Sequence, residues 1–344
     1  MKHNWTYRPF MECIENVKYT TKLQTKDFAQ QGTYPVISQD ESYISGYWNN
    51  AEDVFHTKRP LVIFGDHTRV LKYIDFDFVL GADGVKILLP TEDILAKYLY
   101  YYLKWYNVPS LGYSRHFKLL RDIELPIPSL DEQQAIVREL DGINRLIDLQ
   151  EEQLREYDRL AQSLFYSTFG DPVSNPKGWE VKKFADAFKL KSGDGLSAKS
   201  FINGPYPVYG GNGISGNHNT YNLDGEFIII GRVGALCGNV RCVSGQFWLT
   251  DNAFQLFYDK GINNTTFLEK LLEYLNLNQY ANHSAQPVIS NVTLKDVKII
   301  FPPLSLQQSF ASQIEAIEQQ KALIRRSLDE TRTLLAARMQ YYFE

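Results

Sequence analysis

The chain has 344 residues, of which 44% are apolar, and a net charge of −4. Its length favours about two domains, and its apolar content is sufficient for a core in each. No run of 18 apolar residues offers a membrane span, no apolar leader follows Met1, and the three cysteines lack metal-binding spacing. We therefore expect a cytoplasmic protein with reduced thiols and no membrane partner.

The negative charge is concentrated in one segment. Residues 131–170 contain nine acidic residues and four arginines, so this segment has a net charge of −5 and the rest of the chain has +1. A basic face elsewhere on the molecule is therefore compatible with the overall charge, which neither supports nor excludes DNA as a partner.

Two modules of mixed α and β character are predicted, at residues 1–128 and 179–302. Leu61–Phe64 and Phe227–Ile230 are short apolar runs followed by glycine, which is typical of buried strands. Tyr34-Pro35-Val36 matches Tyr206-Pro207-Val208 as a shorter strand. Segments 93–106 and 266–277 are rich in aromatic residues or leucine and predict short helices.

The second half of the chain repeats the first at an offset of 174 residues. Identical residues recur at this spacing in the modules and in the segments after them: Trp5 and Trp179, Phe10 and Phe184, Gln133-Gln134 and Gln307-Gln308, Leu154 and Leu328, Phe169 and Phe343. The chain is therefore a diverged internal duplication, built to hold two similar modules.

Each module is followed by a long predicted helix, at residues 129–170 and 303–344. Each helix opens at a pair of prolines and contains a Gln-Gln in its first turns. Apolar residues recur at alternating steps of three and four, which indicates a coiled-coil seam. The seam residues are Leu140, Ile143, Ile147, Leu154, Ile314, Ile317, Ile324 and Leu328. Gln150, Lys321 and Thr331 are polar exceptions. Packing of each helix on its own module is the alternative.

The connection between the halves predicts how the helices pair. Residues 171–178 are too few to return the chain along the first helix, so the second module should follow at its far end and the second helix should run back antiparallel. The predicted fold is α+β, with two similar mixed α/β domains joined by an antiparallel coiled coil in a pseudo-twofold repeat.

Gly211-Asn212-Gly213-Ile214-Ser215-Gly216 matches the GxGxxG pattern of dinucleotide-binding folds. That function needs a helix directly afterwards, whereas the next residues have a loop composition, which favours a flexible recognition loop. The sequence has no phosphate-loop, metalloprotease, nucleophile-elbow or methyltransferase motif, so we expect no catalytic residue, no metal site and no bound cofactor.

Polar, aromatic and cationic residues cluster between the predicted strands, where they could contact DNA bases and phosphates. In the first module they are Tyr47, Trp48, Asn49, His67, Arg69, Lys72, Arg115, His116 and Lys118. In the second they are Asn212, Ser215, Asn217, His218, Arg232, Arg241, Asn282, His283 and Gln286. Each residue alone could equally be an ordinary solvated or capping group.

Several of these segments together resemble the specificity subunits of type I restriction–modification enzymes along almost the whole chain. The resemblance rests on the two Gln-Gln helix starts, on Tyr206–Gly216, on Ile230-Gly231-Arg232-Val233-Gly234 and on Ser284-Ala285-Gln286-Pro287. The first module departs from the pattern, because Gly65-Asp66-His67 stands where the second has Gly231-Arg232-Val233.

The resemblance implies a non-catalytic, sequence-specific subunit that binds double-stranded DNA. Each module would read one half of an asymmetric bipartite site, while the coiled coil would set the spacing and dock methyltransferase subunits that carry S-adenosylmethionine. A motor–nuclease subunit would complete the complex. Two alternatives remain open at this point: a scaffold that binds two protein partners, and an enzyme that binds a nucleotide at the glycine-rich segment.

Overall fold

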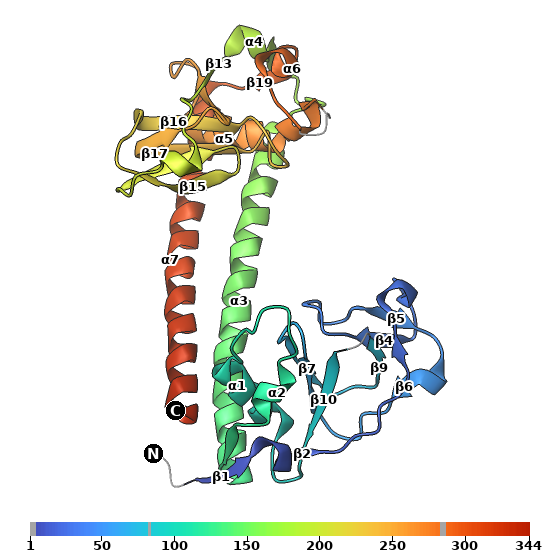
Figure 1. The fold of residues 1–344 in the computed structure, drawn as a ribbon. Helices are drawn as coiled ribbons and strands as arrows, with labels where there is room; N and C mark the ends of the chain where they lie inside the picture. The colour runs from blue at the N-terminus through green and yellow to red at the C-terminus, as the bar shows by residue number, and fades with distance from the viewer. Residues whose placement is uncertain (1–4, 82–83, 283–286) are drawn as a thin grey trace. The chain divides into compact units, whose positions relative to one another are not determined.

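The computed structural model describes residues 5–81, 84–282 and 287–344 (Figure 1). It divides into two compact units. The first unit comprises residues 1–151 and 325–344, and the second comprises residues 152–324. Each unit therefore contains one module together with part of both long helices, α3 (Leu130–Phe169) and α7 (Leu304–Phe343).

The first unit contains two small sheets and a strand pair. One sheet has the order β2 (Ile14–Glu15), β10 (Val85–Pro90), β7 (Leu61–Gly65), β8 (Leu71–Ile74). The other has the order β3 (Lys22–Leu23), β9 (Phe78–Gly81), β4 (Tyr34–Ile37), β5 (Gly46–Trp48), with β6 (Val54–Phe55) also paired to β9. The remaining elements are the antiparallel pair β1 (Thr6–Pro9) and β11 (Glu124–Ile127), and the helices α1 (Ala96–Tyr106) and α2 (Phe117–Leu120).

The second unit has one larger sheet. Its strand order is β13 (Lys189–Ser192), β18 (Ala253–Phe257), β16 (Leu223–Gly231), β17 (Val240–Leu249), β14 (Tyr206–Gly210), β15 (Gly213–His218). An antiparallel pair, β12 (Glu180–Lys183) and β19 (Lys298–Phe301), corresponds to β1 and β11. The helices are α4 (Phe184–Ala187), α5 (Thr265–Tyr274) and α6 (Asn291–Leu294). The strands and short helices predicted in both modules are present, with ends shifted by up to four residues.

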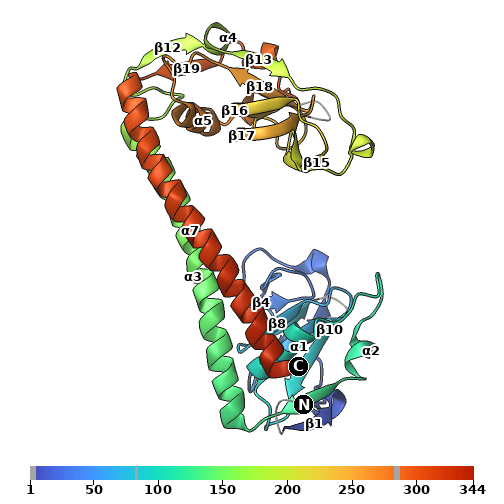
Figure 2. The same ribbon diagram turned by 90° about the vertical axis from the view of Figure 1, so that its left-hand side faces the viewer.

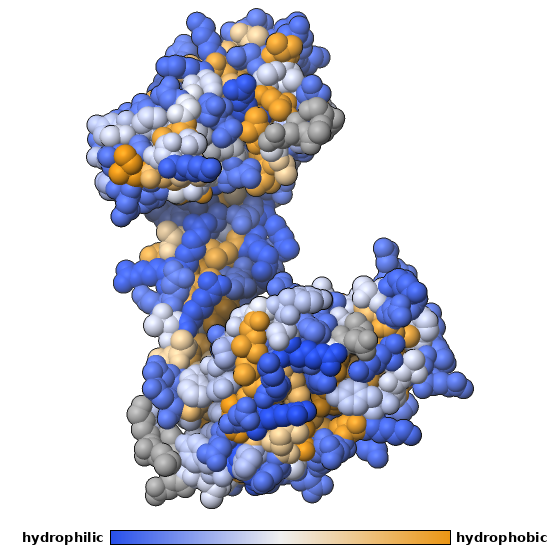
Figure 3. All heavy atoms as spheres, viewed as in Figure 1, coloured by the Kyte–Doolittle hydropathy of each residue, from blue (hydrophilic) through white to orange (hydrophobic). Residues whose placement is uncertain are grey.

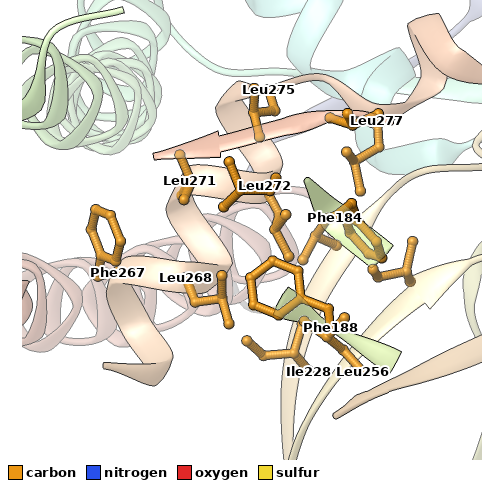
Figure 4. Packing of buried hydrophobic residues seen from close by; sticks show 14 of the residues in the cluster. Phe184, Phe188, Ile228, Leu256, Phe267, Leu268, Leu271, Leu272, Leu275 and Leu277 are labelled. Atoms are coloured by element: carbon orange, nitrogen blue, oxygen red, sulfur yellow. The ribbon is translucent and has the colours of Figure 1, made fainter. Parts of the chain in front are cut away.

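The core of the second unit forms where α5 packs on the sheet (Figure 4). Phe267, Leu268, Leu271 and Leu272 of α5 are fully buried, because their spacing of three and four residues places them on one face of this short helix. In the first unit, α1 occupies the equivalent place and buries Tyr98, whose hydroxyl donates to Pro126 O at 2.9 Å.

The Gln-Gln pair at each helix start has a structural explanation. Gln307 is buried, and its Oε1 accepts a hydrogen bond from Asn264 N, the N-cap of α5. Its Nε2 donates to Ile262 O and Pro302 O. Gln133 makes the same three bonds, with Leu95 N, Asp93 O and Pro128 O. One amide therefore holds the start of a long helix against the start of a short helix in both modules.

The predicted seam between α3 and α7 is present (Figure 2). Leu140, Ile314, Ile317 and Leu328 are buried, while Ile143, Ile147, Leu154 and Ile324 are half-buried. In the first unit, Arg338 bonds Glu139 and Arg332 bonds Glu151. The partner number rises along α3 as it falls along α7, so the helices run antiparallel.

Each long helix ends with a phenylalanine in a module core, which explains the repeat of Phe169 and Phe343. Phe343, at the end of α7, packs against Tyr98, Tyr102 and Trp105 of α1, with ring centroids 5.6–5.9 Å apart. Phe169, at the end of α3, packs against Phe267 at 4.7 Å in the second unit. Each helix thus begins beside its own module and ends in the core of the other one.

Candidate nucleic-acid interface

The glycine-rich segment of the second module is a β-hairpin, which corrects the prediction of a flexible loop. Gly213–His218 forms β15, which pairs antiparallel with β14 through a two-residue turn, Gly211-Asn212, between paired Gly210 and Gly213. Gly213 has φ +103°, a value that favours glycine and permits this turn. The dinucleotide function is excluded here, because a strand stands where a phosphate-binding helix would have to begin.

The hairpin borders a groove of about 400 Å³. The described residues that line it include no carboxylate, and Asn212, Ser215, Thr250 and Asn252 supply its polar groups. Arg241 of β17 lies beneath the turn and donates through Nη2 to Asn212 O at 3.5 Å. A Cβ on Gly213 would lie 3.1 Å from the guanidinium carbon, so the arginine packs flat against the turn. Arg241 is half-buried and supports the turn of the hairpin.

Arg232 follows β16 and lies beside the same hairpin. A Cβ on Gly231 would be 2.4 Å from Gly211 O, which shows how closely the two segments approach. The Arg232 guanidinium lies 5.4 Å from the ring centroid of Phe254, and its Nη1 donates weakly to Asp251 O at 3.4 Å. Its buried Nε has no hydrogen-bond partner among the described residues. The arginine is held in place by stacking while most of its donors remain available.

The other predicted residues of the second module divide by burial. Asn212, Ser215, Asn217 and Asn282 are exposed. His218 is buried. Its Nδ1 accepts a hydrogen bond from Ile202 N, and its ring packs edge-on against Trp248. The structure therefore does not support its predicted contact with DNA. His283 and Gln286 lie outside the described residues.

In the first module, Asp66 occupies the position that Arg232 occupies in the second, with the same pattern of backbone hydrogen bonds. Asp66 follows Gly65 at the end of β7, and its backbone N and O bond Gly84 and His116. Arg232 bonds Asn252 and Ile289 in the same way. Asp66 is buried and its Oδ1 accepts from Phe117 N, so it caps the start of α2. Equivalent positions in the two modules therefore present different chemistry.

Cations of the first module surround α2 instead. The Nζ of Lys86 and the guanidinium of Arg121 lie 5.4 and 5.6 Å from the ring centroid of Phe117. Arg115 and Lys118 are exposed and have no ion-pair partner in the described part of the chain. Tyr113 is 99% exposed and stacks loosely on His67 at a centroid distance of 5.8 Å. Basic and aromatic side chains that interleave in this way suit a nucleic-acid surface.

Lys86, Arg121 and Tyr113 were missed by the sequence analysis, although the predicted residues His67, Arg115 and Lys118 lie in the same region. Lys86 lies within a strand and is far in sequence from the other cations. Arg121 could have been found from the sequence, because it continues the basic run that begins with Arg115 and Lys118.

Two predicted residues of the first module are buried and do not support a DNA contact. Lys72 is 3% exposed, its Nζ bonds Ser42 O at 2.6 Å and Asp40 Oδ1 at 3.3 Å, and burial lowers the pKa of its ammonium group. His116 is 1% exposed and bonds Asp66 O and Leu111 N. Both side chains use their polar atoms to hold loops together.

The remaining predictions in the first module fall on internal contacts. Trp48 donates to Asp53, Asn49 accepts from Thr33 N, and Arg69 donates to Val108 O. Tyr47 is half-buried in β5.

Over the described ranges, no helix is both long enough and apolar enough to cross a membrane. Those ranges also hold no cluster of three or more His, Cys, Asp or Glu side chains suited to a metal.

A family model described as "Type I restriction modification DNA specificity domain" matches residues 4–157 and 176–331, which is most of the chain and both halves of the repeat. The chain belongs to this family. The two specificity domains correspond to the two modules with their long helices, as the internal repeat predicts.

Part of this chain is similar to curated specificity subunits. The EcoprrI specificity subunit of Escherichia coli is 35% identical over 162 residues, which are 44% of this chain and 40% of that protein. The EcoR124I/EcoR124II subunit of the same organism is 32% identical over 149 residues, or 38% of this chain and 35% of that one. The alignments therefore span less than half the length of these relatives.

Solved structures share the fold over nearly the full length. An S subunit of a type I restriction–modification system from M. genitalium matches with a TM-score of 0.63 at 17% identity, covering 99% of this chain and 96% of that one. A chain from a study of type I complex assembly and conformational transition matches with a TM-score of 0.57 at 15% identity, covering 99% and 97%. These likenesses extend the specificity-domain fold to the whole chain.

Proposed function

We propose that this chain is the DNA-reading specificity subunit of a type I restriction–modification complex. Each module reads one half of an asymmetric bipartite site in double-stranded DNA, and the coiled coil sets the spacing between the halves. The observation that carries the proposal is the shared backbone frame with different side chains: Asp66 in one module and Arg232 in the other. The buried Asp66 anchors α2 and its cations, whereas Arg232 lies beside a hairpin, so the same backbone position supports two different surfaces, which suits two different half-sites.

Within the second module, Arg232 and the β14–β15 hairpin form the reading surface. A guanidinium stacked on Phe254 keeps its fork-shaped donors in a fixed direction, which favours bidentate contact with guanine or a phosphate. Within the first module, Arg115, Lys118 and Arg121 around α2 provide the corresponding surface. Lys72, His116 and His218 are left out of the proposed contact set because they are buried.

The chemistry of the complex belongs to its partners. Methyltransferase subunits dock on the paired helices and bring S-adenosylmethionine and the modification of the base. A motor–nuclease subunit joins the same complex. The chain itself acts by binding and positioning, without a catalytic residue or cofactor of its own.

The test is duplex binding as a function of salt. Lys and Arg contacts to phosphates release counterions, so log K should fall linearly with log salt concentration, with a slope of about −0.9 per phosphate contacted. Sequencing of methylated bases in cells that carry this chain and its partner subunits identifies the bipartite site. A chain that binds two proteins but no duplex DNA would support the scaffold alternative and overturn the proposal.

A further inference from the structure

The segment between α1 and β11 in the first module is basic. Residues 104–121 contain no aspartate or glutamate and four cations: Lys104, Arg115, Lys118 and Arg121. The chain as a whole has a net charge of −4, so this local charge is opposite in sign to the total. Figure 3 shows strongly hydrophilic side chains next to hydrophobic ones over α2. A surface of this charge attracts the phosphates of DNA.

The loop between α1 and α2 exposes two apolar side chains within this basic segment. Leu111 is 43% exposed and Tyr113 is 99% exposed. Gly112 between them has φ +68°, and a Cβ there would meet no heavy atom within 4 Å among the described residues. Ser114 N donates to Gly112 O at 2.8 Å and closes the turn. The loop therefore presents an aliphatic and an aromatic side chain on either side of a tight turn.

The buried His116 holds the backbone of this loop in one position. Its Nδ1 lies 2.9 Å from Asp66 O, which can only accept a hydrogen bond, so Nδ1 carries the proton. Its Nε2 lies 3.0 Å from Leu111 N, which can only donate, so Nε2 is unprotonated. The imidazole is therefore neutral and uses both nitrogens to tie Leu111 to the residue that follows β7.

A buried histidine holds an exposed aliphatic residue in the second module as well. The Nδ1 of His218 accepts from Ile202 N at 3.1 Å, and Ile202 is 58% exposed. Ile202 precedes β14, whereas Leu111 follows α1, so the two contacts lie on different loops and are not copies made by the duplication. The same arrangement on unrelated loops favours a functional role over inheritance.

We propose that Leu111 reads the first module's half-site by contacting the C5-methyl group of a thymine, and that His116 is the positioning residue for this contact. The inference rests on the proposed function and adds a reading residue and the chemical group that it recognises. The thymine methyl is the apolar group that base pairs present in the major groove. The side chain of Leu111 has no polar atom, so this methyl is its natural complement there.

The neighbours of Leu111 suit the DNA backbone. Tyr113 has a hydroxyl at the end of an exposed ring, and this ring stacks loosely on His67 at a centroid distance of 5.8 Å. Tyrosine hydroxyls and the cations of Arg115 and Lys118 can contact phosphates, which adds affinity without base choice. Leu111 cannot form a side-chain hydrogen bond, so its contribution to base choice depends on apolar contact alone. Removing one methyl group from the DNA therefore tests it selectively.

The experiment measures binding of the full chain to its methylated site, as identified by sequencing, by fluorescence anisotropy. Each thymine of the duplex is replaced in turn by uracil, which removes only the C5-methyl group. One replacement should weaken binding of the unchanged chain about fourfold, the effect of one buried methyl group. Leu111→Ala should weaken binding to the thymine duplex by a similar factor and no longer distinguish thymine from uracil at that position. Met11→Ala, at a residue that is 44% exposed in the same unit, is the control and should keep both affinity and preference.

His116 is tested by its effect on the thymine preference and on the salt dependence of binding. His116→Leu should lose the preference but keep the slope of log K against log salt concentration, because the phosphate contacts remain. His116→Gln, which retains a donor and an acceptor, should restore the preference. A His116→Leu chain that still prefers thymine would remove the positioning role. If His116→Leu melts early, the exposed Leu111→Ala, whose melting temperature should be unchanged, decides the proposal.

Several outcomes would overturn reading by Leu111. The unchanged chain could bind every uracil duplex as tightly as the thymine duplex, or Leu111→Ala could retain the preference. An equal loss on cognate and random duplexes would identify a backbone contact instead. A bend in the bound duplex that Leu111→Ala abolishes, measured by fluorescence energy transfer between the duplex ends, would identify a wedge between base pairs if the thymine preference is absent. Failure of the unchanged chain to bind any duplex would instead overturn the proposed function.

Discussion

Gln307 shows how one buried side chain fixes the geometry of a module. Replacement by leucine keeps the volume but leaves Asn264 N and the carbonyls of Ile262 and Pro302 without their partner. Because unsatisfied buried groups are costly, we expect Gln307→Leu to lower the free energy of unfolding by about 2–4 kcal/mol. Urea denaturation followed by circular dichroism measures this. The exposed neighbour provides the control: Gln308→Leu should change it by less than about 0.5 kcal/mol.

Arg232 gives a second prediction at the residue scale. If its guanidinium reads a base, Arg232→Ala should weaken binding to the cognate duplex by about 1–3 kcal/mol and leave binding to a random duplex almost unchanged. Fluorescence anisotropy with both duplexes at one salt concentration separates the outcomes. An equal loss on both would identify a phosphate contact, and no loss on either would remove Arg232 from the interface.

Residue types and spacing revealed which segments carry polar side chains, but not how deep each side chain lies. Lys72 and His116 have the composition of a binding site, yet both are buried because loop contacts from Ser42 and Asp66 cover them. Lys86 was missed for the opposite reason, since a strand residue becomes part of the surface around α2 only after the chain folds. Burial and long-range proximity depend on tertiary packing, which spacing alone does not encode.

At the scale of elements, the long helices were predicted well because their signal repeats over many turns. Leu140 of α3 and Ile317 and Leu328 of α7 occupy predicted seam positions of the heptad pattern, and the structure buries all three. The β15 strand was predicted as a loop because glycine and polar residues hide its pairing. Its stability comes from β14 and from Arg241 beneath the turn, neither of which is a local property of Gly213–His218.

The seam supports a prediction about the helix pair. Leu140 is fully buried, so Leu140→Asp places an unpaired carboxylate in an apolar contact and should lower the stability of the first unit by several kcal/mol, about 3 or more. Leu146→Asp, on the same helix but 46% exposed, is the matched control and should have little effect. Thermal unfolding of both variants tests the assignment; equal melting temperatures would show that Leu140 is not a seam residue.

At the scale of the whole molecule, duplication explains why the two modules share a frame and differ in their surfaces. The Gln133 and Gln307 networks are the same bond for bond, as expected for the parts that attach each module to the helices. Asp66 and Arg232 differ: the aspartate is buried and caps α2, whereas the arginine is half-buried beside the β14–β15 hairpin, so the surfaces around this shared position are different. Attachment and reading are therefore separable functions of different residues.

This separation predicts the outcome of module exchange. Replacing residues 179–300 with the corresponding segment of a related chain keeps α3, α7 and the Gln307 side chain, so the partner subunits should still assemble. The methylated sequence should then change in one half only, because the first module, with Arg115, Lys118 and Arg121, is untouched. The spacing between the halves should stay constant because the helices are unaltered. Sequencing of methylated bases in cells that carry the exchanged chain provides the readout.

A reciprocal exchange of residues 1–128 is the control and should rewrite only the other half. If one exchange changed both halves, or if the methylated site were a single continuous word, the two modules would not be independent readers.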